Sequence, residues 1–538
     1  MAITPAFTPV FSVNPQTGAQ EFETDSVRAG EIRIGHVNLG EPRRIMQRGS
    51  TSPESVWTPS MSGGYFSRVE LKSSFSSPAA AFSPAWLLGE HTKQHQGESM
   101  QVPVAQWNQA GGNPAGSGFR AVNTVVPVSG RARYIHLPSD AVGSSPVIGP
   151  NGEIYVGTQA GELFVCRIDR ERVLHAPVER KTQIADIAFA VHTPAVAADG
   201  TAYCLCTTTP NPRDHRHPPA PTNLIVAVNR DGTVRWTTPV PPQEFEGHWS
   251  QGFVRGALRV LSDGSAARII FAADYDLFGS YPNIGGQGPI YVRHLGILDE
   301  TGAFRLFHRY QEERLYVDAH GGGGFGETAT LDDLPPLPAG PQLPEGVQPY
   351  RDTPVVFGSM PSSEPWTIVV CGRSGIYAFR WSYLDDSFVA QPGRFSTASP
   401  GTSPAAFPNG LLAATGANAM ALYDTDTFTA YAHTNILGRE TMTAGGLRQI
   451  YCLSRGGVLN LVDSNGEVRK RRQLGADTVA FPVLSANHVH VATMTELRTL
   501  TLDLEDVSSV DLQNQSSFPG RSSPAIGADG SVYLAIGS

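Results

Sequence analysis

Cysteine and histidine are the residue types here with the widest chemistry, because both bind metals and both act in catalysis. Cys204 and Cys206 flank a single residue, and His215 and His217 follow in a proline-rich stretch. Zinc sites commonly separate their paired cysteines by two to four residues, so a Cys-x-Cys pair is a rare arrangement. We therefore interpret the two cysteines as core thiols and the two histidines as loop residues.

His488 and His490 form a second pair. Alternate residues of a strand share one face, so these two imidazoles could chelate a cation together. The alternative is that they are polar positions inside a β-sheet protein. We favour that alternative, and we predict no metal ligand in the chain.

Motifs for phosphate binding and nucleophilic catalysis are missing from the sequence. Gly321–Gly324 is a glycine run, but no strand-and-helix unit precedes it, and the chain has no Gly-Lys dipeptide for a P-loop. We interpret the run as a flexible loop. The Gly-x-Ser-x-Gly elbow of serine hydrolases is missing as well. We predict no catalytic residue and no cofactor, and hence no enzymatic activity.

Charge excludes a nucleic-acid partner. The formal net charge is −9, whereas nucleic-acid binding requires a clustered positive surface. The one dense positive run is Arg469-Lys470-Arg471-Arg472. It could be a solvated edge strand that charge protects from pairing, or it could contact an acidic partner protein.

The five cysteines lie mainly in apolar, strand-like runs, which favours buried free thiols in a reducing compartment. The first residues lack the basic and apolar regions of a secretory signal. No run of roughly 18 apolar residues marks a membrane helix. We therefore expect a cytoplasmic, cytoskeletal location and no membrane partner.

Short strands separated by tight turns must position all of these residues. From Ser145 to Thr158, a short apolar strand leads through Asn151-Gly152 into an alternating strand. We expect Asn-Gly to supply the positive φ angles that a tight hairpin needs. A second turn, a strand over 162–169 and a fourth strand near 172–179 complete a four-stranded meander.

The same pattern recurs along the chain. Further copies begin near Thr193, Gly256, Asp352, Thr402, Gly445, Phe481 and Ser522. The copy at Ser522 reaches Ser538 after two strands, and we expect residues 119–128 and 132–137 to supply its missing strands. Closing a ring in this way removes open sheet edges. The sequence therefore predicts an all-β fold, an eight-bladed β-propeller of four-stranded antiparallel blades closed by N-terminal strands.

The string from Ser145 to Asp169, repeated in part from Ser523 to Tyr533, resembles the PQQ-like (quinoprotein-like) propeller repeat. The resemblance covers residues 119–538. Alternative folds are a seven-bladed WD40-like propeller or an array of β-sandwiches, although the repeated Trp-Asp dipeptides of WD40 proteins are missing.

The resemblance implies what a catalytic member would need. Such enzymes carry a disulfide between adjacent cysteines over the quinone, and a calcium ion beside a catalytic aspartate. This chain has no adjacent cysteine pair, and its seven tryptophans fall irregularly. We therefore expect the repeat to serve binding and not oxidation.

Residues 1–118 lack the repeat and are rich in Pro, Ser, Gly and Thr. We predict an extended arm whose spaced aromatic side chains enter pockets of a partner or of the propeller itself. Its apolar anchors are Phe7, Phe11, Phe22, Trp57, Tyr65, Phe66, Phe75, Phe82, Trp86 and Trp107. A second segment outside the repeat, 311–350, is rich in Gly and Pro and is either a binding loop or a spacer.

These features together predict a non-catalytic scaffold or adaptor subunit, with the propeller as the interaction platform and the arm as a tether. The expected setting is a cytoskeletal assembly such as a ciliary or flagellar axoneme, with tubulin or axonemal proteins as partners. Two alternatives remain. One is a quinoprotein-type oxidoreductase or small-molecule binder that uses the propeller channel, and the other is a structural component of a phage or injection device.

Overall fold

All regular structure in the described residues is β-strand. The computed structural model describes strands between residues 10 and 71 and most of residues 107–535. Within 107–535 the ranges that are not described are 125–143, 168–177, 185–187, 209–220, 222, 246–247, 263–265, 278–286, 318–322, 328–352, 359–365, 372–375, 384, 389–392, 397–402, 417–418, 426–429, 437–441, 447, 476–477, 479 and 513–521. The described part holds no helix with the length and apolar character that a membrane span would need.

The chain divides into two compact units, Met1–Glu98 and Ser99–Ser538. The strands of the first unit form one antiparallel sheet in the order β1-β2-β3-β4, with β5 also paired to β3. They are β1 (Val10–Val13), β2 (Gln20–Glu23), β3 (Ile32–Asn38), β4 (Tyr65–Phe66) and β5 (Val69–Leu71). The sequence predicts an extended arm over 1–118. The described strands instead pair into a sheet, and residues 107–118 belong to the second unit.

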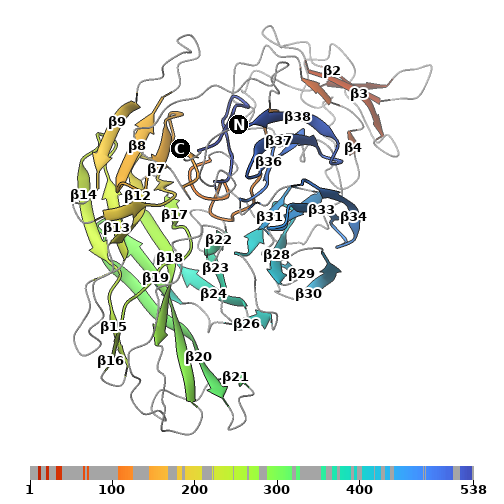
Figure 1. The fold of residues 1–538 in the computed structure, drawn as a ribbon. Helices are drawn as coiled ribbons and strands as arrows, with labels where there is room; N and C mark the ends of the chain where they lie inside the picture. The colour runs from red at the N-terminus through yellow and green to blue at the C-terminus, as the bar shows by residue number, and fades with distance from the viewer. Residues whose placement is uncertain are drawn as a thin grey trace. The chain divides into compact units, whose positions relative to one another are not determined.

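The second unit is a β-propeller of antiparallel blades, in which each blade is a meander with its first strand innermost (Figure 1). The first three blades are β6–β9, β10–β14 and β17–β21. Their strands are β6 (Val147–Ile148), β7 (Ile154–Gly157), β8 (Glu162–Cys166), β9 (Val178–Gln183), β10 (Ala188–Val191), β11 (Ala195–Val196), β12 (Ala202–Thr208), β13 (Asn223–Val228), β14 (Val234–Pro239), β17 (Arg259–Ser262), β18 (Ala267–Leu277), β19 (Gln287–Asp299), β20 (Phe304–Val317) and β21 (Gly323–Glu327). A separate hairpin, β15 (Gln243–Phe245) and β16 (His248–Ser250), lies between the second and third blades in sequence.

The fourth to seventh blades are β22–β26, β27–β30, β31–β34 and β35–β38. Their strands are β22 (Val355–Phe357), β23 (Trp366–Cys371), β24 (Ile376–Ser382), β25 (Ser387–Phe388), β26 (Gly393–Ser396), β27 (Ala405–Ala406), β28 (Leu411–Gly416), β29 (Ala419–Asp424), β30 (Ala430–Asn435), β31 (Met442–Gly445), β32 (Gln449–Leu453), β33 (Val458–Asp463), β34 (Val468–Gln473), β35 (Val483–Leu484), β36 (His488–Ala492), β37 (Glu496–Thr501) and β38 (Asp506–Asp511). A last hairpin joins β39 (Ala525–Ile526) to β40 (Val532–Tyr533).

The Ser/Thr-Pro pairs of the repeat link neighbouring inner strands around the ring. In each pair the hydroxyl accepts a hydrogen bond from the backbone N–H of the preceding blade. Ser145 donates to Thr193 Oγ1 at 2.8 Å, and Thr353 donates to Ser403 Oγ at 2.9 Å. Ser523 closes the circuit by donating to Ser145 Oγ at 2.9 Å. The hydroxyl residue thus recurs because it joins one blade to the next.

The prediction of eight blades is wrong, because the described residues form seven. The eighth repeat forms the two-stranded hairpin β39–β40, which is joined to the seventh blade through Phe481 N–H and Ser523 Oγ at 2.8 Å. Residues 119–124 do not extend this hairpin. Phe119 bridges to Leu484 of β35, and Ala486 donates to the carbonyl of Val122. The segment expected to complete the last blade is therefore used at the inner strand of the seventh, and the other expected strand, 132–137, lies outside the described residues.

The turns between paired strands follow from Asp-x-x-Gly and related sequences. Asp299 Oδ1 accepts hydrogen bonds from Thr301 N (2.9 Å) and Thr301 Oγ1 (2.6 Å), which fixes the turn. Gly302 follows with φ of 84° and donates to Asp299 O at 3.0 Å. The bond closes a four-residue turn that ends in a glycine of left-handed conformation. At Asn151-Gly152 the glycine alone takes a positive φ, so the expectation that both residues would do so is wrong.

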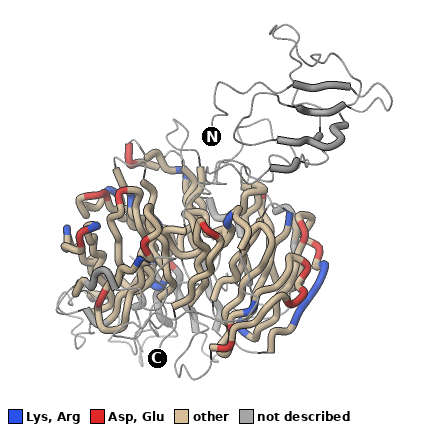
Figure 2. The backbone as a smooth tube through the Cα atoms, turned by 90° about the horizontal axis from the view of Figure 1, so that it is seen from above, with Lys and Arg blue, Asp and Glu red and all other residues tan. Residues whose placement is uncertain are grey.

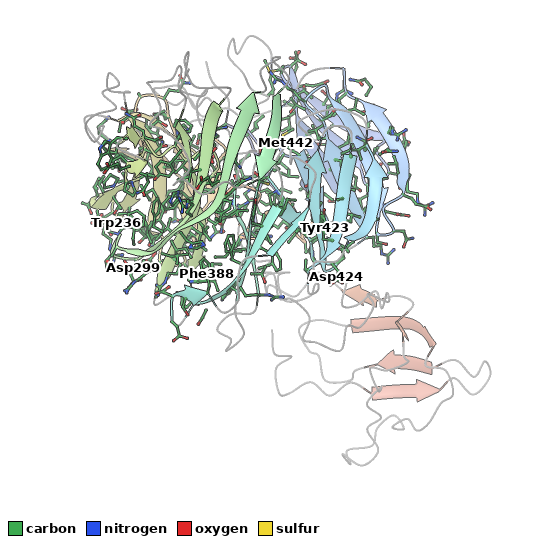
Figure 3. The ribbon with its side chains drawn as sticks, turned by 90° about the horizontal axis from the view of Figure 1, so that it is seen from below. Trp236, Asp299, Phe388, Tyr423, Asp424 and Met442 are labelled. Carbon is green, nitrogen blue, oxygen red and sulfur yellow. The ribbon has the colours of Figure 1, made fainter. Side chains whose placement is uncertain are left out.

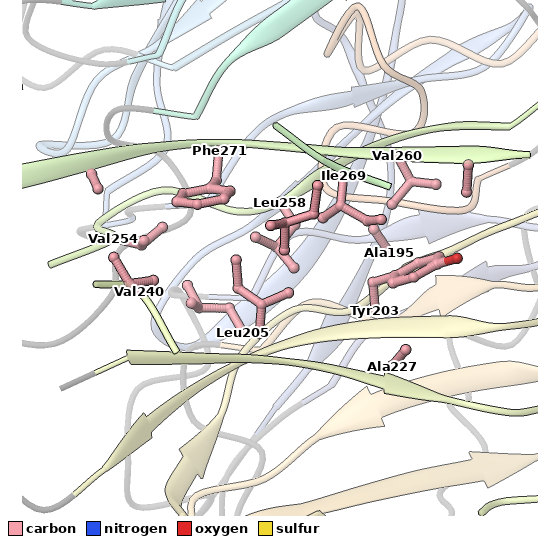
Figure 4. Close-up of a cluster of buried hydrophobic side chains, with 14 of the residues drawn as sticks. Ala195, Tyr203, Leu205, Ala227, Val240, Val254, Leu258, Val260, Ile269 and Phe271 are labelled. Carbon is pink, nitrogen blue, oxygen red and sulfur yellow. The ribbon is translucent and has the colours of Figure 1, made fainter. Parts of the chain in front are cut away.

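The core lies between blades, because each sheet buries both of its faces against its neighbours. Between the second and third blades, Tyr203, Leu205 and Ile225 pack against Ile269 and Phe271 (Figure 4). All five are at most 1% exposed. Burial on both faces explains why the inner strands read as continuous apolar runs and do not alternate.

A second inter-blade contact repeats at the outer strands. A threonine hydroxyl on one outer strand donates to the carbonyl of the left-handed turn glycine of the next blade. In the part of the chain that the structure describes, these bonds are Thr182–Gly232 (2.9 Å), Thr238–Gly302 (2.7 Å) and Thr434–Gly466. Beside the second of these, Trp236 Nε1 donates to Glu300 O at 2.8 Å, and Figure 3 shows Trp236 near Asp299 of the next blade.

Replacing Thr238 by Val removes one of these bonds while keeping the side-chain volume. We expect the free energy of unfolding to fall by about 1 kcal/mol, because the carbonyl of Gly302 loses its donor. Thr237→Val on the same strand is the matched control, since Thr237 is exposed and should change the free energy by less than about 0.5 kcal/mol. Urea unfolding of both variants measures the difference, and equal midpoints would contradict the role of the threonine bond.

Candidate functional site

The centre of the propeller is occupied by residues of this chain. We call Trp107–Arg120 the central segment. Almost all of it is buried, and Gln109 and Ser117 have 0% exposure. In Figure 1 this stretch is drawn in orange in the middle of the ring of blades. Trp107, counted on sequence among the aromatic residues of the arm, is part of the propeller core and packs with Ile148, Val483 and Ala525.

The central segment meets the inner strands in chain order. Ile148 of β6 donates its N–H to Trp107 O at 2.7 Å, and Val196 of β11 donates to Asn108 O at 2.8 Å. At the third blade the partner is a side chain. Gln109 Oε1 accepts from Val260 N at 3.0 Å, and Gln109 Nε2 donates to Val260 O at 3.1 Å. The glutamine amide thus replaces a peptide group of the segment.

The circuit continues through the remaining blades. Each inner strand donates one N–H to a carbonyl of the central segment. The bonds are Val356–Pro114 (2.9 Å), Ala406–Ala115 (2.9 Å), Gly445–Ser117 (2.9 Å) and Leu484–Gly118 (2.7 Å). Arg120 N then donates back to Leu484 O at 2.9 Å, and Arg120 Nη1 donates to Ile526 O of the last hairpin. Within the described residues, all seven blades and β39 therefore bond to one continuous segment.

Glycine makes this small circle possible. Gly111, Gly112, Gly116 and Gly118 all have φ between 62° and 87°, a region that L side chains rarely adopt. Space is equally restrictive, since a Cβ on Gly118 would lie 2.6 Å from Cβ of Ala444. The segment therefore depends on glycine both for its backbone conformation and for its close approach to the inner strands.

Arg259 holds the segment from the first position of β17. Its side chain is buried; Nε donates to Pro354 O at 2.7 Å, and Nη1 donates to Ala110 O and, at 3.3 Å, to Asn113 O. Among the described residues, the partners of this guanidinium are carbonyl oxygens. Desolvation lowers the pKa of Arg259 to about 9, so the group stays charged near neutral pH. It serves as a multiple donor to the turn of the central segment.

Four residues after the central segment, Thr124 lies between two histidines. Thr124 Oγ1 lies 2.9 Å from His488 Nδ1 and 3.0 Å from His490 Nε2. Thr499 Oγ1 lies 3.0 Å from the other ring nitrogen of His490. Both imidazoles are therefore used in hydrogen bonds to Thr124, beyond the end of the central segment. Burial lowers the pKa of His490 to about 3, which keeps the ring neutral.

Of the cysteine and histidine candidates between 204 and 217, the two cysteines are packed into the core. Cys204 and Cys206 are both buried and free, and burial raises the pKa of each thiol well above its usual value. Such thiols are poor nucleophiles, because the thiolate is the reactive form. His215 and His217 lie outside the described residues. Within the described part of the chain, no three His, Cys, Asp or Glu side chains form a group that could hold a metal.

The basic run lies on β34, the outermost strand of the sixth blade, and Figure 2 shows it as a blue stretch at the edge of the propeller beside red segments. Three of its four charged side chains pair with carboxylates of this chain. Arg469 pairs with Asp463 and Glu467, Lys470 with Glu505, and Arg472 with Asp506. Arg471 bonds instead to amide and carbonyl oxygens of Asn460 and Asn435.

Because Glu505 and Asp506 come from the seventh blade, the run joins two blades at the rim. This arrangement favours the edge-strand interpretation over a surface that offers free positive charge to a partner.

The aromatic residues of the expected arm are only partly described. Phe11, Phe22, Tyr65 and Phe66 lie on strands β1, β2 and β4. Phe7, Trp57, Phe75, Phe82 and Trp86 lie outside the described residues. Their role in docking remains a prediction.

The segment 311–350 contains more structure than the sequence indicates. Strand β20 runs on to Val317, and β21 (Gly323–Glu327) pairs with it through Tyr316 and Gly324. The interpretation of Gly321–Gly324 as a flexible loop is therefore wrong for Gly323 and Gly324. Residues 328–350, with the proline-rich part, lie outside the described residues.

Sequence reasoning missed the central segment altogether. The signal was present as four glycines in the eight residues from 111 to 118, between two buried polar residues, Gln109 and Arg120. It could not be distinguished from the surrounding Pro/Ser/Gly-rich composition, because only contacts with seven distant strands reveal its role.

Comparison with known proteins gives likenesses of architecture only. No family model matches the chain. No curated protein matches it. Similar solved structures include BamB from Moraxella catarrhalis (12% identity, 68% of this chain and 84% of that chain, TM-score 0.36). Others are Sqt1 of Saccharomyces cerevisiae (8%, 78% and 99%, TM-score 0.45) and the dihydro-heme d1 dehydrogenase NirN in complex with DHE (11%, 69% and 66%, TM-score 0.38). At such identities and scores they support no functional argument.

Buried neutral histidines should make the propeller sensitive to acid. Burial lowers the pKa of His192 to about 4 and that of His490 to about 3, whereas an unfolded histidine titrates near 6.5. The unfolded state therefore binds protons first as the pH falls. We expect the free energy of unfolding to be highest above pH 6.5 and to decrease from there toward pH 4.

The variant His490→Gln measures how much one histidine contributes to this pH dependence of the free energy of unfolding. The variant should lose less stability than the wild type between pH 7 and pH 4, and the difference between the two should be constant above pH 7.5. Urea unfolding across this pH range measures both curves. Parallel curves down to pH 4 would contradict the lowered pKa of His490.

The matched charges at the rim predict weak binding to polyanions. The wild-type protein should elute from heparin at low salt, because carboxylates neutralise the basic run. The double variant Glu505→Gln/Asp506→Asn should elute at higher salt, since it frees Lys470 and Arg472. Asp511→Asn removes an exposed carboxylate on β38, outside the rim pairs, and is the control for a loss of negative charge elsewhere on that strand. Equal elution of the double variant and the wild type would contradict this account.

Proposed function

We propose that this chain is a non-catalytic scaffold or adaptor whose propeller serves as a rigid interaction platform. The observation that carries the proposal is the central segment. In a propeller, the channel is where a cofactor or small substrate would meet side chains from many blades. Here Trp107–Arg120 takes that place and uses the inner N–H groups of all seven blades. The faces, the rim and the loops of the propeller are then the surfaces that would bind partner proteins.

The first unit is the proposed tether. Its sequence combines Pro, Ser and Gly with spaced aromatic residues, a composition suited to docking on a partner protein. The proposed assembly is cytoskeletal. The candidate setting is a ciliary or flagellar axoneme, and the candidate partner is tubulin. A phage or injection device is the alternative setting.

Removal of residues 1–98 tests the tether and keeps the central segment. We expect the full-length chain to co-sediment with its native assembly, and with microtubules if the cytoskeletal setting is right, whereas the 99–538 chain stays in the supernatant. Equal melting temperatures of the two chains would establish that the propeller is intact. If the truncated chain co-sediments as well as the full-length chain, the tether hypothesis is wrong.

The second candidate function, a quinoprotein-type oxidoreductase or small-molecule binder with a PQQ-like repeat, is tested on the same purified protein. A bound quinone gives an absorption band above 300 nm, and bound calcium appears in elemental analysis. We expect neither at a stoichiometric level. A quinone band that scales with protein concentration would overturn the non-catalytic proposal.

A further inference from the structure

The ring of inner strands has the properties of a peptide-binding site. Inner strands pair on one side with the second strand of their own blade, and their other edge faces the centre. Strand edges expose unpaired N–H and C=O groups, and an added peptide can bind to them. Here the peptide does not lie along one edge. It crosses one strand edge after another and accepts a hydrogen bond from one backbone N–H of each inner strand.

We propose that this ring of strand edges is a binding site for a glycine-rich peptide, and that residues 107–120 are its ligand, supplied by the chain itself. The proposal does not depend on the scaffold function. Recognition rests on the order of the acceptors along the segment. Backbone carbonyl groups, and the side-chain amide of Gln109 at the third blade, reach the blades one after another in chain order.

Three contacts give the site its specificity. Gln109 offers an acceptor to the backbone N–H of Val260 and a donor to its backbone C=O. Gly118 is selected by its positive φ and by its contact with Ala444. Arg259 adds a buried cation that binds two carbonyls of the ligand's own turn.

The ligand also folds upon itself, which favours one bound conformation. Gly118 N donates to Gly111 O at 2.9 Å and brings the two halves of the segment together. Asn113 Nδ2 donates to Ser117 Oγ at 2.7 Å across the turn between them. A peptide without glycines at these positions could not form this compact loop.

Non-covalent binding can be tested in the full-length chain. One protease site is inserted in residues 99–106 and a second in residues 125–143, on either side of the central segment. After folding and cleavage, only non-covalent contacts hold the excised peptide. We expect native mass spectrometry to record the propeller with one peptide, and fluorescence of a labelled peptide to give a dissociation constant below micromolar.

Two variants and two matched controls test the contacts. Gly118→Val should weaken peptide binding by about 100-fold or more, because it forces a clash at a positive φ. Gly475→Val is its control, since Gly475 has φ of 80° but no atom within 4 Å of an added Cβ. Gln109→Ala should weaken binding about tenfold or more, because Val260 is left without partners. Gln473→Ala on the exposed outer strand is its control.

The outcomes separate clearly. Retention of one peptide by the cleaved wild-type protein, with weakening by Gln109→Ala and not by Gln473→Ala, supports the site even if Gly118→Val fails to fold. Loss of the peptide from the cleaved wild-type protein at micromolar concentration, whether or not the propeller stays folded, would overturn it. Equal affinity of the wild-type and Gln109→Ala peptides would overturn it as well.

Discussion

The inner edge of every blade carries backbone N–H groups that are shielded from water and need acceptors. A buried amide without a partner costs free energy comparable to a lost hydrogen bond. This chain meets the requirement with one segment, Trp107–Arg120, which supplies an acceptor to each of the seven blades. The rest of the propeller depends on that arrangement, because the segment fixes how the inner strands stand around the centre.

Successive blades are joined at three radii by different interactions. Near the centre, Ser and Thr hydroxyls link one inner strand to the next, as between Ser145 and Thr193. Farther out, apolar side chains such as Phe271 fill the space between sheets. At the outer strands, threonine–glycine bonds and the ion pairs of Lys470 and Arg472 complete the contacts. Exposed ion pairs contribute little to stability, so the first two layers dominate.

Occupation of the centre by the chain also decides which chemistry is open to it. The groups that bond to the central segment are backbone amides and carbonyls and the guanidinium of Arg259, and neutral histidines lie beside Thr124 just after it. They form a satisfied hydrogen-bond network, in which donors and acceptors serve to hold a peptide. The thiol of Cys204 is buried, and its raised pKa keeps it protonated and unreactive. The proposal of a platform for protein partners rests on this occupied centre.

The sequence by itself determined the repeat, the antiparallel meander and most turns, because these depend on residues near one another in the chain. Asp299 and Gly302 fix a turn within four residues, and apolar runs such as Asn223–Val228 mark strands that are buried on both faces. The number of blades, the partners of Arg469–Arg472 and the role of residues 107–120 were decided by tertiary structure. Seven or eight blades differ only in which distant segment pairs with β40, and local pattern carries no information on that choice. The same holds for Gly118, which reads as part of a flexible tail until Ala444 and Leu484, more than three hundred residues away, are brought against it.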